Sequence, residues 1–450
     1  MSVVPAPRTR GAEAATGFGS EAAVDPRRLL PSPRRGDGGR PREGRPPARS
    51  AARRLLSSVS ATDRAVLTLY LLTRIGIWAT AYCTGWLFTG DGRAKEAPPL
   101  LSRWEQWDWS YFVRIAEYGY FGSPDGSDAA PQDNREAFFP GLPLLLRAVH
   151  TVVPDWTVAG LLISFVAGAV AVLALARTAR LHLAEPAGTQ AKGGSREGDA
   201  GERAVFFLLL SPCAVFLAVG YTEALFLALA MPAWLAAKKG RWPSAAVLAC
   251  CATTVRISGL FLAAALAAEF LTSTAAAPAS DRLRRLRVLP WLAVPALPAL
   301  AYTWYLQART GDWMAWKHAQ ERGWYRQFHS PWEAWQNTWD SAFSHTQTTG
   351  YALMFRAELV AMVLGLLVLA RLLQRRRWPE AVYLALTLWA LGTSYWYMSI
   401  PRATLLWWPL WIGLARWSLR RPWIRTAHLC VSAPLMTVFA VAFASGRWAG

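Results

Sequence analysis

Cysteine and histidine are scarce in this chain of 450 residues, and neither shows the spacing of a metal site. The five cysteines form no CxxC pair, and almost all lie within apolar stretches, where a thiol behaves as a small apolar side chain. The six histidines form no HxxxH pair and have no carboxylate cluster nearby. The sequence therefore predicts no disulfide framework, no metal centre and no other cofactor.

Glycine-rich phosphate loops, nucleotide-binding fingerprints and internal repeats are also absent, so nucleotide-dependent chemistry is not expected. Charged residues make up only 17% of the chain, whereas hydrophobic residues make up 53% and tryptophan occurs 25 times. This composition is typical of a chain that lies mostly in lipid. The net charge of +19 arises from arginines in the N-terminal tail and in short loops beside apolar stretches. That is the positive-inside pattern, so we expect the lipid bilayer as partner and no nucleic acid.

The first 54 residues are rich in Pro, Arg, Gly and Ala and contain no apolar run long enough for the core of a signal peptide. We predict that residues 1–54 form a disordered cytoplasmic tail and that residues 55–450 form one transmembrane domain of a multi-pass cell-membrane protein. Arginines precede the first apolar span, residues 65–88, which puts the N-terminus inside. A first outer loop is then expected at 89–137 and a second at 308–350.

Two apolar segments are interrupted by polar residues. Residues 204–237 contain Ser211-Pro212 and a polar turn at 220–223, which predicts two short helices. Residues 243–271 contain Arg256 at their middle and have basic flanks on both sides, which also predicts two half-length helices. With the other apolar stretches, the sequence predicts an all-α bundle of about ten transmembrane helices.

The number of membrane crossings between residues 138 and 203, and hence the orientation of this segment, stays open from the sequence. Residues 138–153 are short for a span and carry Arg147, whereas residues 156–176 are long enough to cross. Two crossings here would put Arg177 and Arg180 outside, against the charge rule. We expect residues 177–203, which carry charges of both signs, to form a solvated loop.

The segment RWEQWDWSYFVRIAEYGY, residues 103–120, lies in the first outer loop. A helix over this segment would bring its aromatic residues into one stripe on a membrane surface, where Trp and Tyr rings favour the headgroup level. The stripe would consist of Trp104, Trp107, Tyr111, Ile115 and Tyr118. Asp108 lies at its edge, so we expect a partly desolvated carboxylate that can act as a base toward a lipid-borne substrate. The alternative is a solvated loop acid.

Six segments, in order along the chain, resemble motifs of the bacterial relatives of the GPI second-mannosyltransferase family (PIG-V). They are WDWSYFVRIAEYGY, EAFFPGLPLLLR, SPCAVFLAVGYTEALF, TTVRISGL, TGDWMAWKHAQERGW and SIPRATLLWWP. The resemblance extends over roughly residues 65–417. One departure is Ile257-Ser258, which stands where the family often has Ser-Asn.

The resemblance implies a GT-C glycosyltransferase, a polytopic enzyme that passes a sugar from a polyprenyl phosphate to a hydroxyl on the outer face of the membrane. The expected activity is inverting transfer of mannose from polyprenyl-phosphate mannose to a lipid, glycan or protein acceptor. Asp108 would be the general base, because the acceptor hydroxyl must lose a proton as it attacks C1. A transporter or flippase of a lipid-linked sugar is the alternative. Such proteins place their coupling acids within spans, whereas the best acid here is in an outer loop.

Three residues of the first outer loop are further candidates for substrate binding. Trp107 and Tyr111 could stack on a sugar or prenyl chain, or could be interfacial anchors. Glu136 directly precedes the point where the loop re-enters the membrane, so it could position the acceptor or simply be an acid at a helix start.

Three charged residues near apolar helices are candidates for the donor site. Arg256 lies within an apolar stretch, where a guanidinium needs a partner; that partner could be the donor phosphate or Glu223. Arg402 follows Ile400-Pro401 at an outer helix end and could bind the phosphate through two N–H groups, or could snorkel to the interface. Arg74 and Arg147 are expected to be structural.

Overall fold

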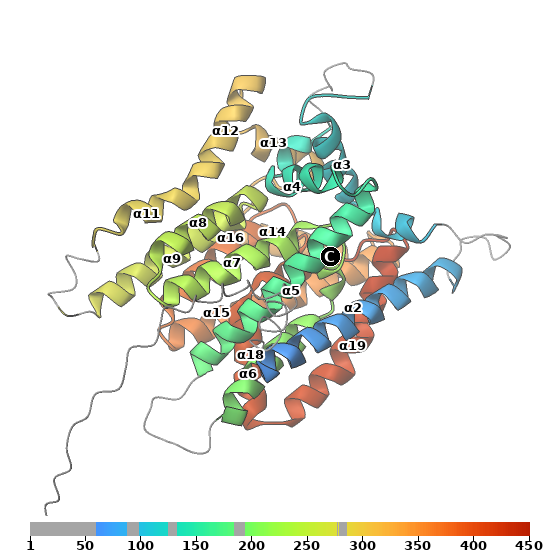
Figure 1. Ribbon diagram of the computed structural model, residues 1–450. Helices are drawn as coiled ribbons and strands as arrows, with labels where there is room; N and C mark the ends of the chain where they lie inside the picture. The colour runs from blue at the N-terminus through green and yellow to red at the C-terminus, as the bar shows by residue number, and fades with distance from the viewer. Residues whose placement is uncertain (1–59, 88–98, 125–132, 184–193, 277, 279–285) are drawn as a thin grey trace, which may run out of the picture. The chain divides into compact units, whose positions relative to one another are not determined.

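The computed structural model describes residues 60–87, 99–124, 133–183, 194–276, 278 and 286–450, and every regular element in these residues is a helix (Figure 1). These residues lie in one compact unit, Ser57–Gly450. The expected all-α fold is confirmed, whereas the predicted tail, residues 1–54, lies outside the described residues. The helices of ten residues or more are α2 (Ala61–Leu87), α3 (Trp109–Tyr118), α4 (Gly141–His150), α5 (Trp156–Leu183), α6 (Gly194–Leu209), α7 (Thr222–Lys238), α8 (Trp242–Val255), α9 (Ser258–Ala275), α12 (Leu297–Thr310), α13 (Ala315–Trp324), α14 (Pro331–Phe343), α15 (Thr349–Gln374), α16 (Trp378–Gly392), α18 (Trp408–Arg420) and α19 (Trp423–Ala444).

Among the described residues, five helices are long and apolar enough to cross a membrane: α2, α5, α9, α15 and α19. The other predicted crossings correspond to shorter helices, α7, α8, α16 and α18, and to the run α11 (Leu289–Ala293), η4 (Val294–Ala296) and α12. Pro290, Pro295 and Pro298 explain why that run is divided, because proline lacks the N–H that a continuous helix needs. The count of about ten crossings stays a prediction.

Both predicted interruptions are confirmed. The chain leaves α6 after Leu209, passes through the short helix η3 (Ala214–Leu217), and enters α7 at Thr222. It leaves α8 at Val255 and re-enters a helix at Ser258, with Arg256 in extended backbone conformation between them. An arginine in this break can turn its side chain away from the helix axes, which is how Arg256 reaches a polar site.

Two sets of contacts place the helices of the front half. Arg147 on α4 donates to the carbonyls of Ala116 and Glu117 at the end of α3, so α4 is tied to α3, and its ten residues are too few to cross a membrane. Arg177 and Arg180, near the end of α5, pair with Asp63 at the start of α2. Helix α5, which is long and apolar enough to cross a membrane, lies between Arg147 and these arginines. The orientation of this part of the chain stays a prediction.

The expectation of a solvated loop over 177–203 is wrong in both of its described parts. Helix α5 continues to Leu183, and α6 begins at Gly194. Arg177 and Arg180 both pair with the carboxylate of Asp63 on α2, so these charged residues are accommodated within the helix α5. Residues 184–193 lie outside the described residues.

The continuous aromatic helix predicted for 103–120 is also wrong. The short helix η1 (Leu100–Trp104) ends before Glu105, Trp107 has a left-handed backbone with φ of 51°, and α3 begins only at Trp109. The cause is Tyr221, whose hydroxyl accepts the N–H of Asp108 and donates to the carbonyl of Gln106. Backbone groups that would continue a helix are thereby taken by a distant side chain. Trp104 and Ile115 are buried, so no stripe faces the membrane.

The second outer loop, predicted at 308–350, carries two helices. Helix α13 packs on η2 (Arg135–Ala137) of the first outer loop, where Gln320 donates to the carbonyl of Ala137. Helix α14 begins with a capping box in which Ser330 and Glu333 satisfy each other's backbone N–H groups. In Figure 1, α3, α4 and α13 lie close together, whereas α14 packs on α15 and α16.

Candidate active site

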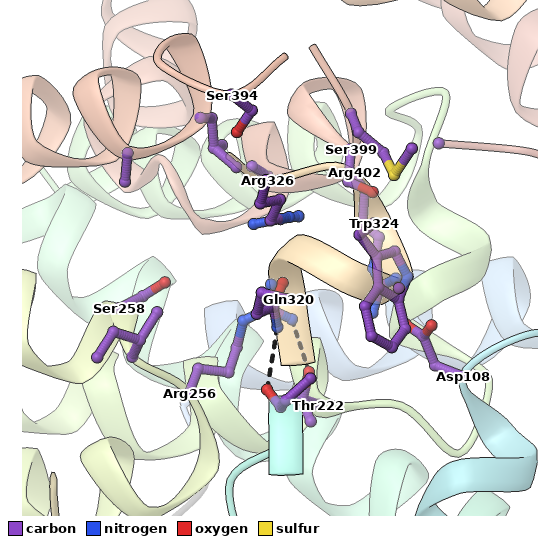
Figure 2. A pocket seen from close by; sticks show the side chains of 18 of the residues that line it. Asp108, Thr222, Arg256, Ser258, Gln320, Trp324, Arg326, Ser394, Ser399 and Arg402 are labelled. Carbon is purple, nitrogen blue, oxygen red and sulfur yellow. Dashed lines mark hydrogen bonds and ion pairs between the residues drawn. The ribbon is translucent and has the colours of Figure 1, made fainter. Parts of the chain in front are cut away.

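A cavity of about 1070 Å³ lies where the interrupted helices end (Figure 2). Its walls come from α3 and η2 of the first outer loop, the start of α7, the α8–α9 junction, α13 with the segment after it, and the end of α16 with the turn that follows. Each break in an apolar helix thus brings polar backbone or side chains to this place. Most of the lining residues are apolar or aromatic, and the charged ones are Asp108, Arg256, Lys317, Arg326 and Arg402.

The polar centre contains a chain of charged side chains. Glu223, at the start of α7, has no exposed surface, and its Oε1 accepts from Nη1 of Arg256 at 2.5 Å and from Nε of Arg402 at 2.6 Å. Arg402 continues the chain through Nη1, which lies 2.9 Å from Oδ2 of Asp108. Two acids and two arginines from four separate elements are therefore joined, and their charges balance.

The position of Arg402 is fixed from several sides. Its guanidinium lies over the rings of Phe216 and Tyr221, at 4.8 and 4.7 Å from the centroids. It belongs to α17 (Ile400–Ala403), which begins after Ser399, a residue with φ of 69°. The buried carboxylate of Glu358 on α15 accepts the N–H groups of Ser399 and Ile400 and so holds this strained turn. A serine keeps a left-handed backbone only where its surroundings hold it. Because Glu358 holds Ser399 in this way, it also fixes the short helix that carries the guanidinium of Arg402.

Asp108 is not a solvated loop acid. Its side chain is 18% exposed, and one oxygen is paired with Arg402. It stands at the first position before α3 but does not cap that helix, so its carboxylate is directed into the cavity. The following residue, Trp109, packs its ring against Gly160 of α5 and Gly220, where any side-chain carbon would overlap the indole. The backbone of Asp108 is therefore anchored on both sides, by Tyr221 and by Trp109.

Trp107 and Tyr111 both line the cavity. The ring of Tyr111 stacks on Phe138 at 5.1 Å and lies 5.7 Å from Trp324. Burial and the charge of Asp108 raise the pKa of Tyr111, so its hydroxyl stays protonated and can donate a hydrogen bond. Trp107 is 45% exposed, and its indole N–H donates to the carbonyl of Arg447. Both aromatic residues thus belong to the site.

Two predicted binding residues do not contact the cavity. Glu136 is 3% exposed, lies beneath the wall, and has its pKa raised by burial, which favours the neutral acid. Its backbone carbonyl accepts from Tyr302, so the residue ties η2 to α12. Glu223 lies behind the cavity and acts on it only through Arg256 and Arg402. Direct binding of substrate by either carboxylate has no support in this geometry.

The two arginines expected to be structural differ in their contacts. Arg147 donates to the carbonyls at the end of α3. Arg74 is buried on α2, where its guanidinium lies 5.2 Å from the ring centroid of Tyr70 and forms no hydrogen bond with the described residues. Neither residue lines the cavity.

Arg326 is the residue that the sequence analysis missed. It lies between α13 and α14, lines the cavity, and reaches toward the same space as Arg256 (Figure 2). Two backbone hydrogen bonds fix the surrounding segment to the chain after α16: Tyr395 donates to Tyr325, and His329 donates to Thr393. The aromatic residues on either side of Arg326 were the available signal, but an arginine in a polar loop is ordinary until packing brings it inward.

The described residues contain no group of three or more His, Cys, Asp and Glu side chains that could hold a metal ion. All five cysteines are free. Metal independence stays an expectation.

Comparison with known proteins confirms the resemblance seen in the motifs. The family profile described as Mannosyltransferase (PIG-V) matches residues 94–290, which contain four of the six motifs. The GPI alpha-1,6-mannosyltransferase 2 of Cricetulus griseus is 32% identical over 171 residues, covering 36% of this chain and 30% of that protein. The Mus musculus protein of the same name is 29% identical over 192 residues, covering 40% and 34%. The match thus spans about a third of the length of these curated relatives.

Two solved structures are similar to this chain at low identity and with TM-scores below 0.5. ArnT from Cupriavidus metallidurans, bound to undecaprenyl phosphate, has a TM-score of 0.43 and 12% identity, covering 86% of this chain and 69% of that chain. The Archaeoglobus fulgidus oligosaccharyltransferase, tethered with an acceptor peptide, has a TM-score of 0.38 and 12% identity, covering 85% and 55%.

Proposed function

We propose that this chain is an integral-membrane mannosyltransferase that takes mannose from a polyprenyl-phosphate donor. The observation that carries the proposal is the cavity, in which Asp108 and three arginines meet inside a largely apolar wall. A lipid-linked sugar phosphate has the matching parts: an apolar chain, an anionic phosphate and a polar sugar. The match to the PIG-V profile supports mannose as the sugar.

The proposed reaction is a single displacement with inversion. The acceptor oxygen forms a bond to C1 of mannose while the bond from C1 to the phosphate oxygen breaks, and polyprenyl phosphate leaves with the electron pair. The proton of the acceptor hydroxyl goes to Asp108, whose second oxygen, Oδ1, forms no hydrogen bond within the described residues. Arg402 holds the carboxylate in place during the transfer.

The distribution of charge supports an outer-face reaction. Basic residues gather at the helix ends remote from the cavity: Arg177 and Arg180 on α5, Lys238 and Lys239 after α7, and Arg375 to Arg377 after α15. Positively charged flanks favour the cytoplasmic side, so the cavity would open outside. The acceptor would then be a hydroxyl of a lipid, glycan or protein that is accessible on that face.

The direct test uses membranes that contain the protein and polyprenyl phosphate carrying radiolabelled mannose. We expect label to appear in a product that is resistant to the mild acid that cleaves the donor, and to be absent when membranes lack the protein. Polyprenyl-phosphate glucose serves as the matched control donor. Transfer from the glucose donor alone would contradict the proposed sugar, and the absence of transfer from either donor would contradict the proposed activity.

A further inference from the structure

Arg326 differs from the other two arginines of the cavity in having no partner among the residues that the structure describes. Arg256 and Arg402 share the carboxylate of Glu223, and Arg402 also holds Asp108. Arg326 forms no hydrogen bond or ion pair with the described residues, and its Nε is fully buried without an acceptor. A guanidinium in such surroundings is costly unless an anion approaches it.

The charge of Arg326 persists despite this environment. Burial, together with repulsion from Arg256, lowers the pKa of Arg326 to about 10, which leaves it protonated near neutral pH. Two acids, Asp108 and Glu358, attract the charge of Arg326, but both already have other partners. Asp108 is paired with Arg402, and Glu358 accepts the backbone N–H groups of Ser399 and Ile400. The cavity therefore presents one uncompensated cation at its centre.

An apolar part of the cavity wall, the groove between α9 and α16, comes from residues of these two helices. Leu260 and Phe261 come from the first turn of α9, and Ala390 and Leu391 come from the last turn of α16. The two helices pack against each other, and Ala390 is exposed. Another part of the cavity wall is aromatic and includes Trp107, Tyr351 and Trp448.

From these observations we propose that Arg326 binds the phosphate of the lipid-linked donor, and that the lipid chain leaves the cavity through the groove between α9 and α16. The assignment rests on the proposed function, since it names where the donor of that reaction lies. The planar guanidinium offers two N–H groups to two phosphate oxygens, which matches an anion better than a point charge does. The aromatic wall beside Asp108 is then left for the acceptor.

The test measures binding of a sugar-free lipid, so it is independent of mannose transfer. Purified protein in dodecyl maltoside, an uncharged detergent without phosphate, is titrated with undecaprenyl phosphate, with undecaprenol and with inorganic phosphate. We expect Arg326→Gln to weaken undecaprenyl phosphate binding by roughly tenfold or more, with Arg326→Lys intermediate, because charged hydrogen bonds to the phosphate are lost. Undecaprenol should bind wild type and Arg326→Gln equally.

Arg322→Gln is the matched control for charge, because Arg322 lies four residues earlier on α13 and outside the cavity wall. It should leave the affinity for undecaprenyl phosphate unchanged. Equal affinities of Arg326→Gln and Arg322→Gln variants would overturn the assignment of the phosphate, as would a wild-type protein that does not bind undecaprenyl phosphate. A failure of mannose transfer with this binding pattern intact would contradict only the proposed function.

The path of the lipid chain is tested with Ala390→Trp, which fills the groove, and with Leu386→Trp, one turn earlier on α16 and not part of the wall. Ala390→Trp should lower the affinity for undecaprenyl phosphate and for undecaprenol alike by roughly tenfold. This is about the effect of losing 1.4 kcal/mol of apolar contact. Leu386→Trp should change neither. Unchanged affinity in Ala390→Trp would contradict the path of the lipid chain through the groove. Inorganic phosphate that binds as tightly as undecaprenyl phosphate would show that no lipid chain is recognised.

Discussion

Glu223 has no exposed surface, yet one of its oxygens accepts hydrogen bonds from two arginines that face the cavity. At the scale of single residues, this makes Glu223 the support on which the site depends. Its other oxygen, Oε2, has no partner among the described residues, so the carboxylate is held entirely from one side. Removing it would leave Arg256 and Arg402 without their shared counter-charge.

We predict that Glu223→Ala lowers the free energy of unfolding by about 3–5 kcal/mol, the usual result of leaving a buried charge unpaired. Glu223→Gln keeps the volume and one oxygen, so it should cost less. Thermal unfolding of the purified variants in the same detergent measures this. Glu269→Gln, which breaks the more exposed pair with Lys238, is the control and should have a smaller effect. Equal stability of Glu223→Ala and wild type would contradict a central role for Glu223.

Arg402 and Arg326 should respond differently to substitution by lysine. Arg402 uses Nε for Glu223 and Nη1 for Asp108, and a lysine amine cannot keep both contacts in this geometry. Arg402→Lys should therefore lower kcat by roughly tenfold to 100-fold through a misplaced Asp108, with little change in the donor KM. Arg326→Lys should mainly raise the donor KM. Steady-state kinetics with varied donor concentration separates the two, and a donor KM raised only by Arg402→Lys would reverse the assignment.

At the scale of helices and turns, composition predicted much of what the structure has. Ser211-Pro212 and Arg256 predicted the breaks that the structure places at the cavity, because proline and an intramembrane charge both act locally on a helix. The start of α3 was not predictable, since Tyr221, more than 100 residues away, takes the N–H of Asp108 and the carbonyl of Gln106. Local periodicity holds no information about such a contact.

The candidate site, too, contains residues that the sequence predicted and residues that it did not. Arg256 and Arg402 were identified because a charge beside apolar helices is costly and so requires a partner. Asp108 was identified by its place in the Trp- and Tyr-rich segment of the first outer loop and by the family resemblance. Arg326 was missed because it lies in a loop outside the apolar stretches, and its place in the cavity depends on how α13, α14 and the end of α16 pack. Glu136 was chosen for its position at a membrane re-entry point, but tertiary packing buries it beneath the wall.

The contact that positions the start of α3 gives a prediction at the scale of helices and turns. Gly220 faces the indole of Trp109, where a methyl group would overlap the ring, so Gly220→Ala should displace Trp109 and Asp108 with it. A displacement of about 1 Å at a reacting group costs roughly 100-fold in rate, and we expect a loss of this order in mannose transfer. Gly413→Ala on α18 is the matched control, because nothing lies within 4 Å of its added carbon. Equal rates in the two variants would show that α3 is not positioned by this contact.

At the scale of the whole molecule, basic residues and the cavity lie at opposite ends of the long helices. Asp63 at the start of α2 pairs with Arg177 and Arg180 near the end of α5, so these two helix ends lie together. We propose that positive charge marks the cytoplasmic end, which turns α3 and α13 outward.

This orientation is tested by cysteine labelling in intact cells. Ser344, exposed after α14, should react as cysteine with a membrane-impermeant thiol reagent added outside, whereas Ser244, exposed at the start of α8 beside Arg241, should not. Both variants belong in a background in which the five native cysteines are replaced by alanine. Permeabilised cells are the control, because both sites should then react. Labelling of the Ser244 variant alone in intact cells would reverse the orientation.

The central claim is that Asp108 removes the proton of the acceptor, and the most direct measurement is single-turnover mannose transfer by Asp108→Asn in liposomes. The amide oxygen can still accept from Arg402, so the site should stay intact, but an amide takes up no proton at neutral pH. We predict a rate lower by roughly 100-fold or more, with undecaprenyl phosphate binding unchanged. Asp340→Asn, an exposed acid on α14, should keep the wild-type rate. A rate for Asp108→Asn equal to that of Asp340→Asn would contradict the account.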